Sequence, residues 1–289
     1  MRKLFFLLFF FPLASLAQTA EDSLSMYIEQ VESSLDYQTG NIQLEGANAS
    51  ITVPDGFGYL NLEDSRFVLE ELWGNPADST VLGMLVPKEA GVLSDNSWGY
   101  IINFEELGYV SDEDADKIDY NELLTELKKE TEVESQSRIA QGFESIVLVG
   151  WASSPYYDKD KKTLHWAKEY RFGGTEQSTL NYNLRILGRK GVVMMNAVAS
   201  MPQLEDVKNS ANKVISSVTF NEGHRYSDFN PDVDEVAAWT VGGLVAGKVL
   251  AKVGFFAGLL KFWKVIAIGL AAAGTAIWRF FNRNKETTE

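Results

Sequence analysis

The sequence contains no cysteine among its 289 residues. This absence excludes disulfides, thiol catalysis, iron–sulfur clusters and zinc sites with thiolate ligands. It also excludes a lipoprotein anchor, because acylation at a signal cleavage site requires a cysteine. Histidine is almost as scarce, with only His165 and His224. A metal site with two histidines would need both to converge, and nothing in the local sequence indicates that they do.

Several short motifs of known chemistry are also missing. There is no G-x-S-x-G for a nucleophile elbow and no glycine-rich phosphate loop of the G-x-x-x-x-G-K-[ST] or G-x-G-x-x-G kind. The alternating Asp112, Asp114 and Asp116 resemble a calcium loop in spacing. However, Lys117 takes the place of the required glycine, and Leu123 that of the bidentate glutamate. The sequence therefore predicts a solvated acidic turn, and we expect no cofactor and no metal.

Positive charge is scarce outside the two ends of the chain. The net charge is −14, the first seventeen residues carry +2 and the segment from Val236 onward carries +5, so Gln18–Glu235 carries −21. A body this acidic repels phosphates, which disfavours nucleic acid as a partner. The basic C-terminal segment suits anionic lipid headgroups instead.

The first seventeen residues have the pattern of a secretory signal peptide. Arg2 and Lys3 precede the apolar run Leu4–Leu13, which is too short to span a bilayer comfortably. Small residues follow at Ser15 and Ala17, so we expect cleavage before residue 18. The alternative is an uncleaved N-terminal anchor.

Residues 18–222 predict a soluble α+β domain, with a largely antiparallel sheet and flanking helices. Expected helices cover residues 19–38, begin at the caps Asn61 and Asp119, and begin again at Pro202. Expected strands cover residues 80–86, 97–104, 145–152, 163–172, 179–187 and 192–199, after a hairpin over 42–53. The last four should form a meander closed by the final helix, preceded by a shorter strand–helix portion. Residues 223–235 predict an acidic connector.

The C-terminal segment divides into two expected membrane elements. Residues 261–281 predict a transmembrane helix of about 30 Å, followed by a short polar tail over 282–289. Four residues mark its membrane interfaces: Phe262, Trp263, Trp278 and Arg279. Residues 236–260 predict a membrane-associated helix with one face for helix packing, made by Gly243, Gly247, Gly254 and Gly258. This helix either pairs with the span as a hairpin or lies at the interface, and its glycine face favours self-association or a membrane-protein partner.

The stretch 151–158 combines aromatic residues, a proline and an acid in what we expect to be a loop over residues 153–162. We take it, with a nearby histidine, as a candidate interaction surface, although a rigid structural corner would have the same composition. The surface consists of Trp151, Pro155, Tyr156, Tyr157, Asp158 and His165.

Several separated motifs occur in a fixed order, at residues 108–116, 151–158, 164–167, 180–182 with Arg185, 187–189 and 223–229. In these motifs the sequence resembles the bacterial family known as domain of unknown function 2167, described as predicted membrane-anchored proteins. The resemblance implies a Gram-negative envelope setting and brings no activity and no catalytic residue.

We therefore expect a non-enzymatic binding or scaffold protein in the bacterial inner membrane, with its soluble domain in the periplasm and membrane lipid as a partner. The alternative is an envelope hydrolase or carbohydrate-active enzyme. It would use carboxylates such as Asp158 and Glu169 with Tyr156, Tyr157 or His165, and it requires them to share a cleft.

Overall fold

The computed structural model describes residues 14–75, 77–94 and 96–247. Most of the expected signal peptide and the whole expected transmembrane helix lie outside these residues, as do Gly254, Gly258, Phe262, Trp263, Trp278 and Arg279. Across the described ranges, no helix has both the length and the apolar character that crossing a bilayer requires.

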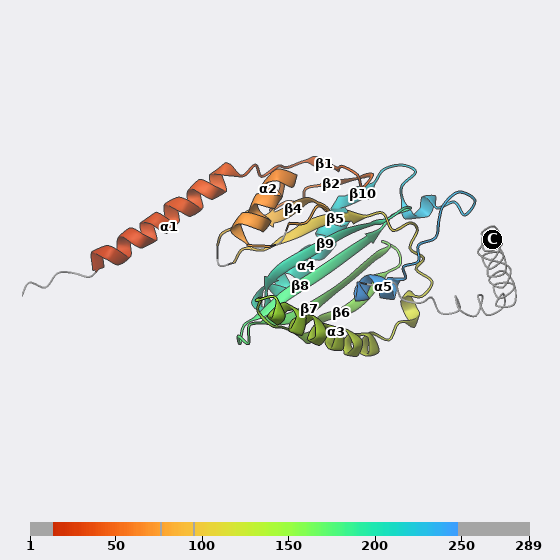
Figure 1. Ribbon diagram of the computed structural model, residues 1–289. Helices are drawn as coiled ribbons and strands as arrows, with labels where there is room; N and C mark the ends of the chain where they lie inside the picture. Colours follow the sequence, from red (N-terminus) through yellow and green to blue (C-terminus); the bar gives the residue numbers. More distant parts are fainter. Residues whose placement is uncertain (1–13, 76, 95, 248–289) are drawn as a thin grey trace, which may run out of the picture.

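One seven-stranded sheet organises the domain, in the order β3-β4-β5-β9-β8-β7-β6 (Figure 1). Every neighbouring pair in it is antiparallel. The strands are β3 (Phe57–Leu60), β4 (Val81–Pro87), β5 (Gly99–Glu105), β6 (Ile146–Asp158), β7 (Thr163–Phe172), β8 (Ser178–Leu187) and β9 (Val192–Ser200). Because β5 pairs with β9, the early strands and the late meander form one continuous sheet.

A small second sheet and one helix cover one face of the large sheet. The small sheet has the order β1-β2-β10, with β1 at Asn41–Leu44, β2 at Ala49–Thr52 and β10 at Val218–Phe220. The helix α4 (Leu204–Ser217) packs beside it and buries Val207, Ala211 and Val214. The hydroxyl of Tyr100 on β5 donates to the carbonyl of Val207 at 3.0 Å, which fixes α4 on the sheet.

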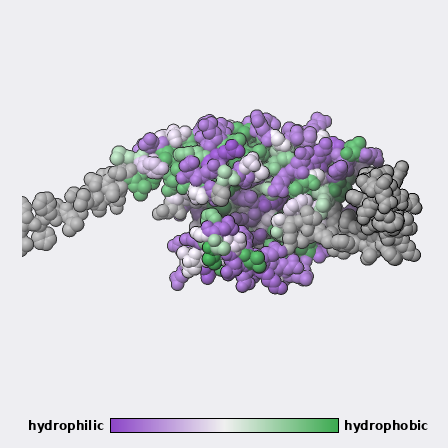
Figure 2. Space-filling model, in the orientation of Figure 1, coloured by the Kyte–Doolittle hydropathy of each residue, from purple (hydrophilic) through white to green (hydrophobic). Residues whose placement is uncertain are grey.

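Two separate hydrophobic clusters cover the opposite face. One lies over β4 and β5 and includes α1 (Ala14–Ser34), α2 (Leu62–Arg66) and the π-helix η1 (Phe67–Leu72). The other lies over β6, β7 and β8 and includes α3 (Tyr120–Ala140) and α5 (Val241–Ala246). Between them the near face of β8 and β9 has no helix over it in Figure 1. Figure 2 shows the surface hollowed there, with hydrophilic residues in the hollow.

The structure confirms the predicted α+β class and most of its elements. The hairpin over 42–53 forms, and the side chains of Asn61 and Asp119 cap the helices that follow them. The four-strand meander closed by α4 is also present. The helix predicted over 19–38 ends earlier, at Ser34, and Gln38 instead forms a bridge with Tyr59.

Two predictions about irregular segments are wrong. The loop expected over 153–162 is mostly strand, because β6 continues to Asp158 and accommodates the proline through register shifts against β7. The helix expected from Val236 begins only at Val241 and ends at Ala246. Gly247 adopts a left-handed conformation with φ 72°, which terminates the helix, and Gly243 is buried against the domain. In the described part, these two glycines therefore form no continuous helix face.

Candidate functional site

Three segments that carry the family resemblance meet at one end of the large sheet. They are the loop between β5 and α3, the hairpin between β6 and β7, and the segment after β10. Their meeting point is Asp112, whose Oδ2 accepts hydrogen bonds from the hydroxyl of Tyr157 and the ammonium of Lys162, each at 2.8 Å. Its Oδ1 lies 3.1 Å from the hydroxyl of Tyr226, which is also 3.0 Å from the carbonyl oxygen of Val110. We call these four residues, Asp112, Tyr157, Lys162 and Tyr226, the Asp112 cluster.

The Asp112 cluster combines one carboxyl with two phenols, and the pKa of the carboxyl is shifted in the opposite direction from those of the phenols. Burial raises the pKa of the Asp112 carboxyl, but the hydrogen bonds it accepts outweigh burial and hold this pKa below its usual value. Burial and neighbouring acidic groups raise the pKa values of the Tyr157 and Tyr226 phenols. The phenols therefore stay protonated and the carboxylate stays ionised, so the cluster has no free base. Its chemistry suits holding three segments together.

The segment predicted as a connector is packed against the domain. Tyr109 donates from its backbone N–H to the carbonyl of Glu235 at 3.0 Å and accepts from Ala237 at 2.8 Å. Arg189 forms an ion pair with Asp234 at 2.8 Å, and the Asp234 side chain is only 2% exposed. The segment therefore continues the domain up to α5 and is not a free linker.

An open groove lies beside the Asp112 cluster. One wall is formed by the β5–α3 loop and the start of α3, and the other by the segment that begins at Phe229. Its volume is about 730 Å³. Tyr109 and Phe229 stack in its wall with ring centroids 3.9 Å apart. The lining also contains one lysine, Lys117, and five carboxylates: Glu113, Asp114, Asp119, Glu122 and Glu126. We call this the acidic groove.

Two of the five carboxylates have structural partners. Asp119 caps α3 by accepting from two backbone N–H groups, and Asp114 accepts from the backbone N–H of Val241 at 3.3 Å. No histidine lines the acidic groove, and the hydroxyl of Thr240 accepts the capping hydrogen bond of α5. The described lining therefore contains no nucleophile paired with a base.

The residues of the predicted interaction surface are divided between the two faces of the sheet. Tyr157 faces Asp112, whereas the exposed Tyr156 meets the ring of His165 edge-on at 5.0 Å between centroids. His165 Nδ1 lies 3.2 Å from the hydroxyl of Tyr182. Pro155 is buried, and Trp151 donates from its indole N–H to the carbonyl of Tyr120 at 3.2 Å. None of them lines the acidic groove.

The same placement bears on the hydrolase alternative. Burial lowers the pKa of His165, so its imidazole is mainly neutral at pH 7. The Asp158 carboxylate accepts from the backbone N–H groups of Asp160 and Lys161, which orders the hairpin turn. Among the described residues, no hydrogen bond links His165, Asp158 and Glu169.

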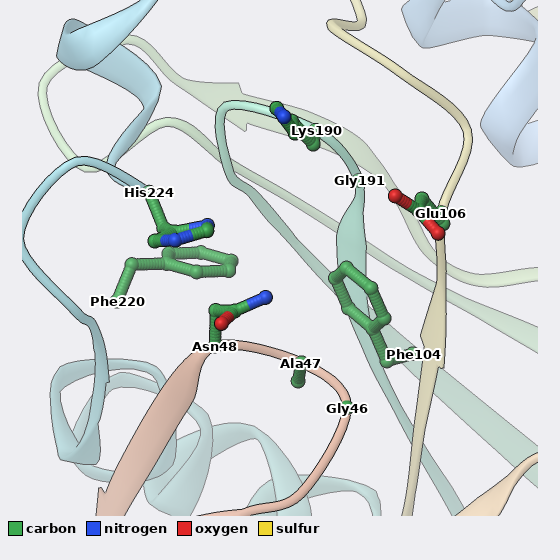
Figure 3. Close-up of a pocket in the computed structure, with 9 residues that line it drawn as sticks. All are labelled: Gly46, Ala47, Asn48, Phe104, Glu106, Lys190, Gly191, Phe220 and His224. Atoms are coloured by element: carbon green, nitrogen blue, oxygen red, sulfur yellow. The ribbon is translucent and has the colours of Figure 1, made fainter.

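The other histidine lies in a different pocket. His224 lines a small cavity of about 100 Å³, where Figure 3 shows it beside Phe220 and facing the hairpin turn that carries Lys190. Among the described residues, the two histidines share no hydrogen-bond partner. No group of three or more potential metal ligands occurs in the part of the chain that the structure describes.

Sequence reasoning missed the Asp112 cluster. Three of its four members lie within the segments that carry the resemblance, and only Lys162 falls outside them. The resemblance was thus the one signal that could have brought them together.

These observations define an α+β domain with a single large antiparallel sheet, a docked C-terminal segment and an acidic groove. The model of the family described as protein of unknown function (DUF2167) matches residues 36–274. The chain therefore belongs to this family, as the resemblance predicted. None of the curated proteins matches its sequence.

Some solved structures are distantly similar. Cyanobacterial PsbP from Synechocystis sp. PCC 6803 has a TM-score of 0.35 at 11% identity, with 64% of this chain and 92% of that chain covered. LpqN of Mycobacterium tuberculosis, involved in cell envelope biogenesis, gives 0.30 at 13% identity, with 59% and 82% covered. The Ran-binding protein Mog1p of Saccharomyces cerevisiae gives 0.31 at 10% identity, with 68% and 100% covered. At these values the likeness carries no argument about function.

Proposed function

We infer that this protein is a membrane-anchored, non-enzymatic binding module of the bacterial envelope, and that its acidic groove binds a cationic segment of a partner protein. The domain lies in the periplasm and the tail holds it at the inner membrane. The groove carries this proposal, because it is a hollow of about 730 Å³ that combines stacked aromatic rings with an excess of carboxylates.

The chemistry of the groove fits a lysine- or arginine-bearing ligand. Aromatic faces attract ammonium and guanidinium groups, and clustered carboxylates of one sign raise the local concentration of a cationic partner. Glu122 and Glu126 are exposed on the same side of α3, one turn apart, where a ligand can reach them. Protonated phenols and an ionised, fully engaged Asp112 beside the groove favour binding over catalysis.

The sequence of the tail supports anchoring. Residues 261–281 combine the length of a bilayer span with aromatic residues at both ends, and an export signal precedes the domain. Self-association through Gly254 and Gly258 stays a prediction, because both lie outside the described residues.

Site-specific photo-crosslinking in intact cells tests the groove. A photoreactive amino acid at Glu122 should give one discrete crosslinked product, and the same residue at exposed Glu63, outside the groove, should give none. With the crosslinker kept at Glu122, Glu126→Lys should remove the product, whereas Glu126→Gln should only weaken it. Equal products at both positions, or none at Glu122, would contradict a binding groove.

Protease accessibility in spheroplasts tests the location. Added protease should digest the domain in spheroplasts, whereas the outer membrane should protect it in intact cells. A domain that stays protected in spheroplasts would be cytoplasmic, and the proposed orientation would then be wrong.

A further inference from the structure

The open part of the large sheet, between the two hydrophobic clusters, carries polar and cationic side chains. Strand alternation places Lys168 of β7 on this face with Asn183 and Arg185 of β8, next to Trp166 of β7, which belongs to the cluster over β6, β7 and β8. Asn196 of β9 pairs in register with Asn183 and completes the strip. A sheet face between two apolar cores would ordinarily be apolar, so this strip requires an explanation.

Arg185 is a buried cation on this face. It is 8% exposed, and its guanidinium lies 5.0 Å from the ring centroid of Trp166. Nη1 donates to the carbonyl of Leu184 and to Oδ1 of Asn196, both at 2.8 Å. Among the described residues it forms no ion pair. Burying a charge under these conditions is costly: burial, opposed by the charge of Glu105, lowers the pKa of Arg185 to about 10.

Lys168 adds a second cation to the same face. Its Nζ makes one long contact of 3.5 Å, to the carbonyl of Val245 at the C-terminal end of α5. Burial and then the neighbouring Arg185 lower its pKa to about 8, whereas Glu130 and Glu134 act in the opposite direction. Lys168 therefore remains mostly cationic at pH 7, close enough to Arg185 for the two charges to repel one another.

The strip also has an unused hydrogen-bond donor. The indole N–H of Trp166, a residue only 2% exposed, has no acceptor among the residues that the structure describes. Buried donors are nearly always satisfied, so an orphan donor marks a place where a further acceptor fits. Two cations and one N–H group are thus gathered in the hollow, where Glu105 acts on Arg185, and Glu130 and Glu134 act on Lys168, through their charges.

We propose that this hollow binds an oxyanion, such as a phosphate or dicarboxylate group of a small ligand, between Arg185 and Lys168. The bound oxygens would accept from the guanidinium and the ammonium and would relieve the repulsion between them. The site is separate from the acidic groove: Gly242 near the start of α5 lines the groove, whereas Val245 near its end contacts Lys168. The two sites can therefore be tested independently.

The competing explanation is that Arg185 serves packing alone, through its stacking on Trp166. In that case, replacing Arg185 would lower stability to the same degree with and without an anion. Replacing Lys168 would not change the affinity for an anion. Anion binding predicts that both residues contribute to the affinity for the anion, whatever their effect on the free protein.

Isothermal titration calorimetry on the full-length protein in detergent separates these explanations, with inorganic phosphate and succinate as probes. Wild type should bind at least one of them saturably. Arg185→Gln and Lys168→Gln should each weaken binding at least tenfold. Lys88→Gln, which removes an exposed charge in the turn after β4, should leave it unchanged. The stronger probe identifies the kind of oxyanion.

Absence of saturable binding by wild type for both probes would overturn the proposal. Equal affinity in wild type and the Lys168→Gln variant would do the same. Circular dichroism should show that each variant is folded. If Arg185→Gln is not, Lys168→Gln still decides the question, because the Lys168 ammonium makes a single long hydrogen bond within the described part of the chain.

Discussion

Replacing Asp112 by asparagine should destabilise the protein, because it removes the charge at the centre of the Asp112 cluster. The substitution keeps the shape but removes the charge and turns an NH₂ group towards other donors. In the wild-type protein the Asp112 carboxylate accepts three hydrogen bonds, one of them from an ammonium. Hydrogen bonds to charged groups contribute about 1.5–3 kcal/mol each. Because the Asp112 side chain is 21% exposed and partly screened, we expect a total loss of about 3 kcal/mol.

The loss should be visible in thermal unfolding. In a domain of this size, 1 kcal/mol corresponds to about 2–4 °C in Tm, so Asp112→Asn should lower Tm by about 6–12 °C. The effect should also depend on pH. The folded-state pKa of Asp112 lies below its ordinary value, so its contribution is present above the unfolded pKa of about 4 and is lost as pH falls through the folded pKa. Wild type and variant should therefore converge in acid.

Asp232→Asn is the matched control, because Asp232 is exposed and its side chain makes no hydrogen bond to a neighbouring segment. It should change Tm by no more than about 1 °C. A double-mutant cycle of Asp112→Asn with Tyr226→Phe should give a coupling energy above about 0.5 kcal/mol. If Asp112→Asn behaves like the control, or if the coupling is zero, the Asp112 cluster does not hold the three segments together.

Three further predictions concern stability and can be read from urea midpoints. Burial lowers the pKa of Lys168 to about 8, whereas the unfolded chain keeps 10.5. As pH rises between these values, the free energy of unfolding of wild type should therefore increase by up to about 3 kcal/mol relative to that of Lys168→Met. A difference that stays constant with pH would contradict the burial of Lys168. Gly191→Ala should cost about 2 kcal/mol because its Cβ would clash with the carbonyl of Glu105, whereas Gly150→Ala, in open space, should be near neutral; similar costs for both would refute the clash. Asn61→Ala should cost about 1 kcal/mol and Asn61→Asp almost nothing, since only alanine removes the cap of α2.

The regular elements could be predicted from sequence because local signals agree with the packing. Alternating residues such as Trp98, Tyr100 and Ile102 mark the buried face of β5, and the structure places all three in one core cluster. Asp119 and Asn61 mark helix starts through the hydrogen bonds that their side chains accept. These signals depend on neighbours in the sequence, which is why they were sufficient.

The errors have the opposite origin. Residues 153–158 contain a proline and polar residues, which indicate a loop, yet pairing with β7 keeps them in a bulged strand. Residues 223–235 are polar and acidic, which indicates a connector, and the sequence does not show that the ion pair of Arg189 with Asp234 holds them on the domain. In both cases partners distant in the sequence decide the structure, and periodicity contains no information about them.

The candidate sites were unpredictable for the same reason. Asp112 lies 114 residues before Tyr226 and 45 before Tyr157, and Arg185 has no motif that distinguishes it from any other strand arginine. The sequence indicated which segments are shared with a family. It did not indicate which of these segments contact one another in the folded protein. Once the fold brings them together, the segments at the Asp112 cluster are seen to form one junction.

The docked C-terminal segment limits how far the domain can lie from a membrane. Val245 is 1% exposed and fixed on the sheet, and residues 248–260 separate Gly247 from the expected span. Thirteen residues reach at most about 45 Å even when fully extended. If residues 261–281 cross the inner membrane, both the acidic groove and the Arg185–Lys168 hollow adjoin α5, the element from which the chain leaves for the bilayer. Ligands that reach either site would then do so close to the membrane surface, which favours a membrane-protein partner for the groove over a freely diffusing one.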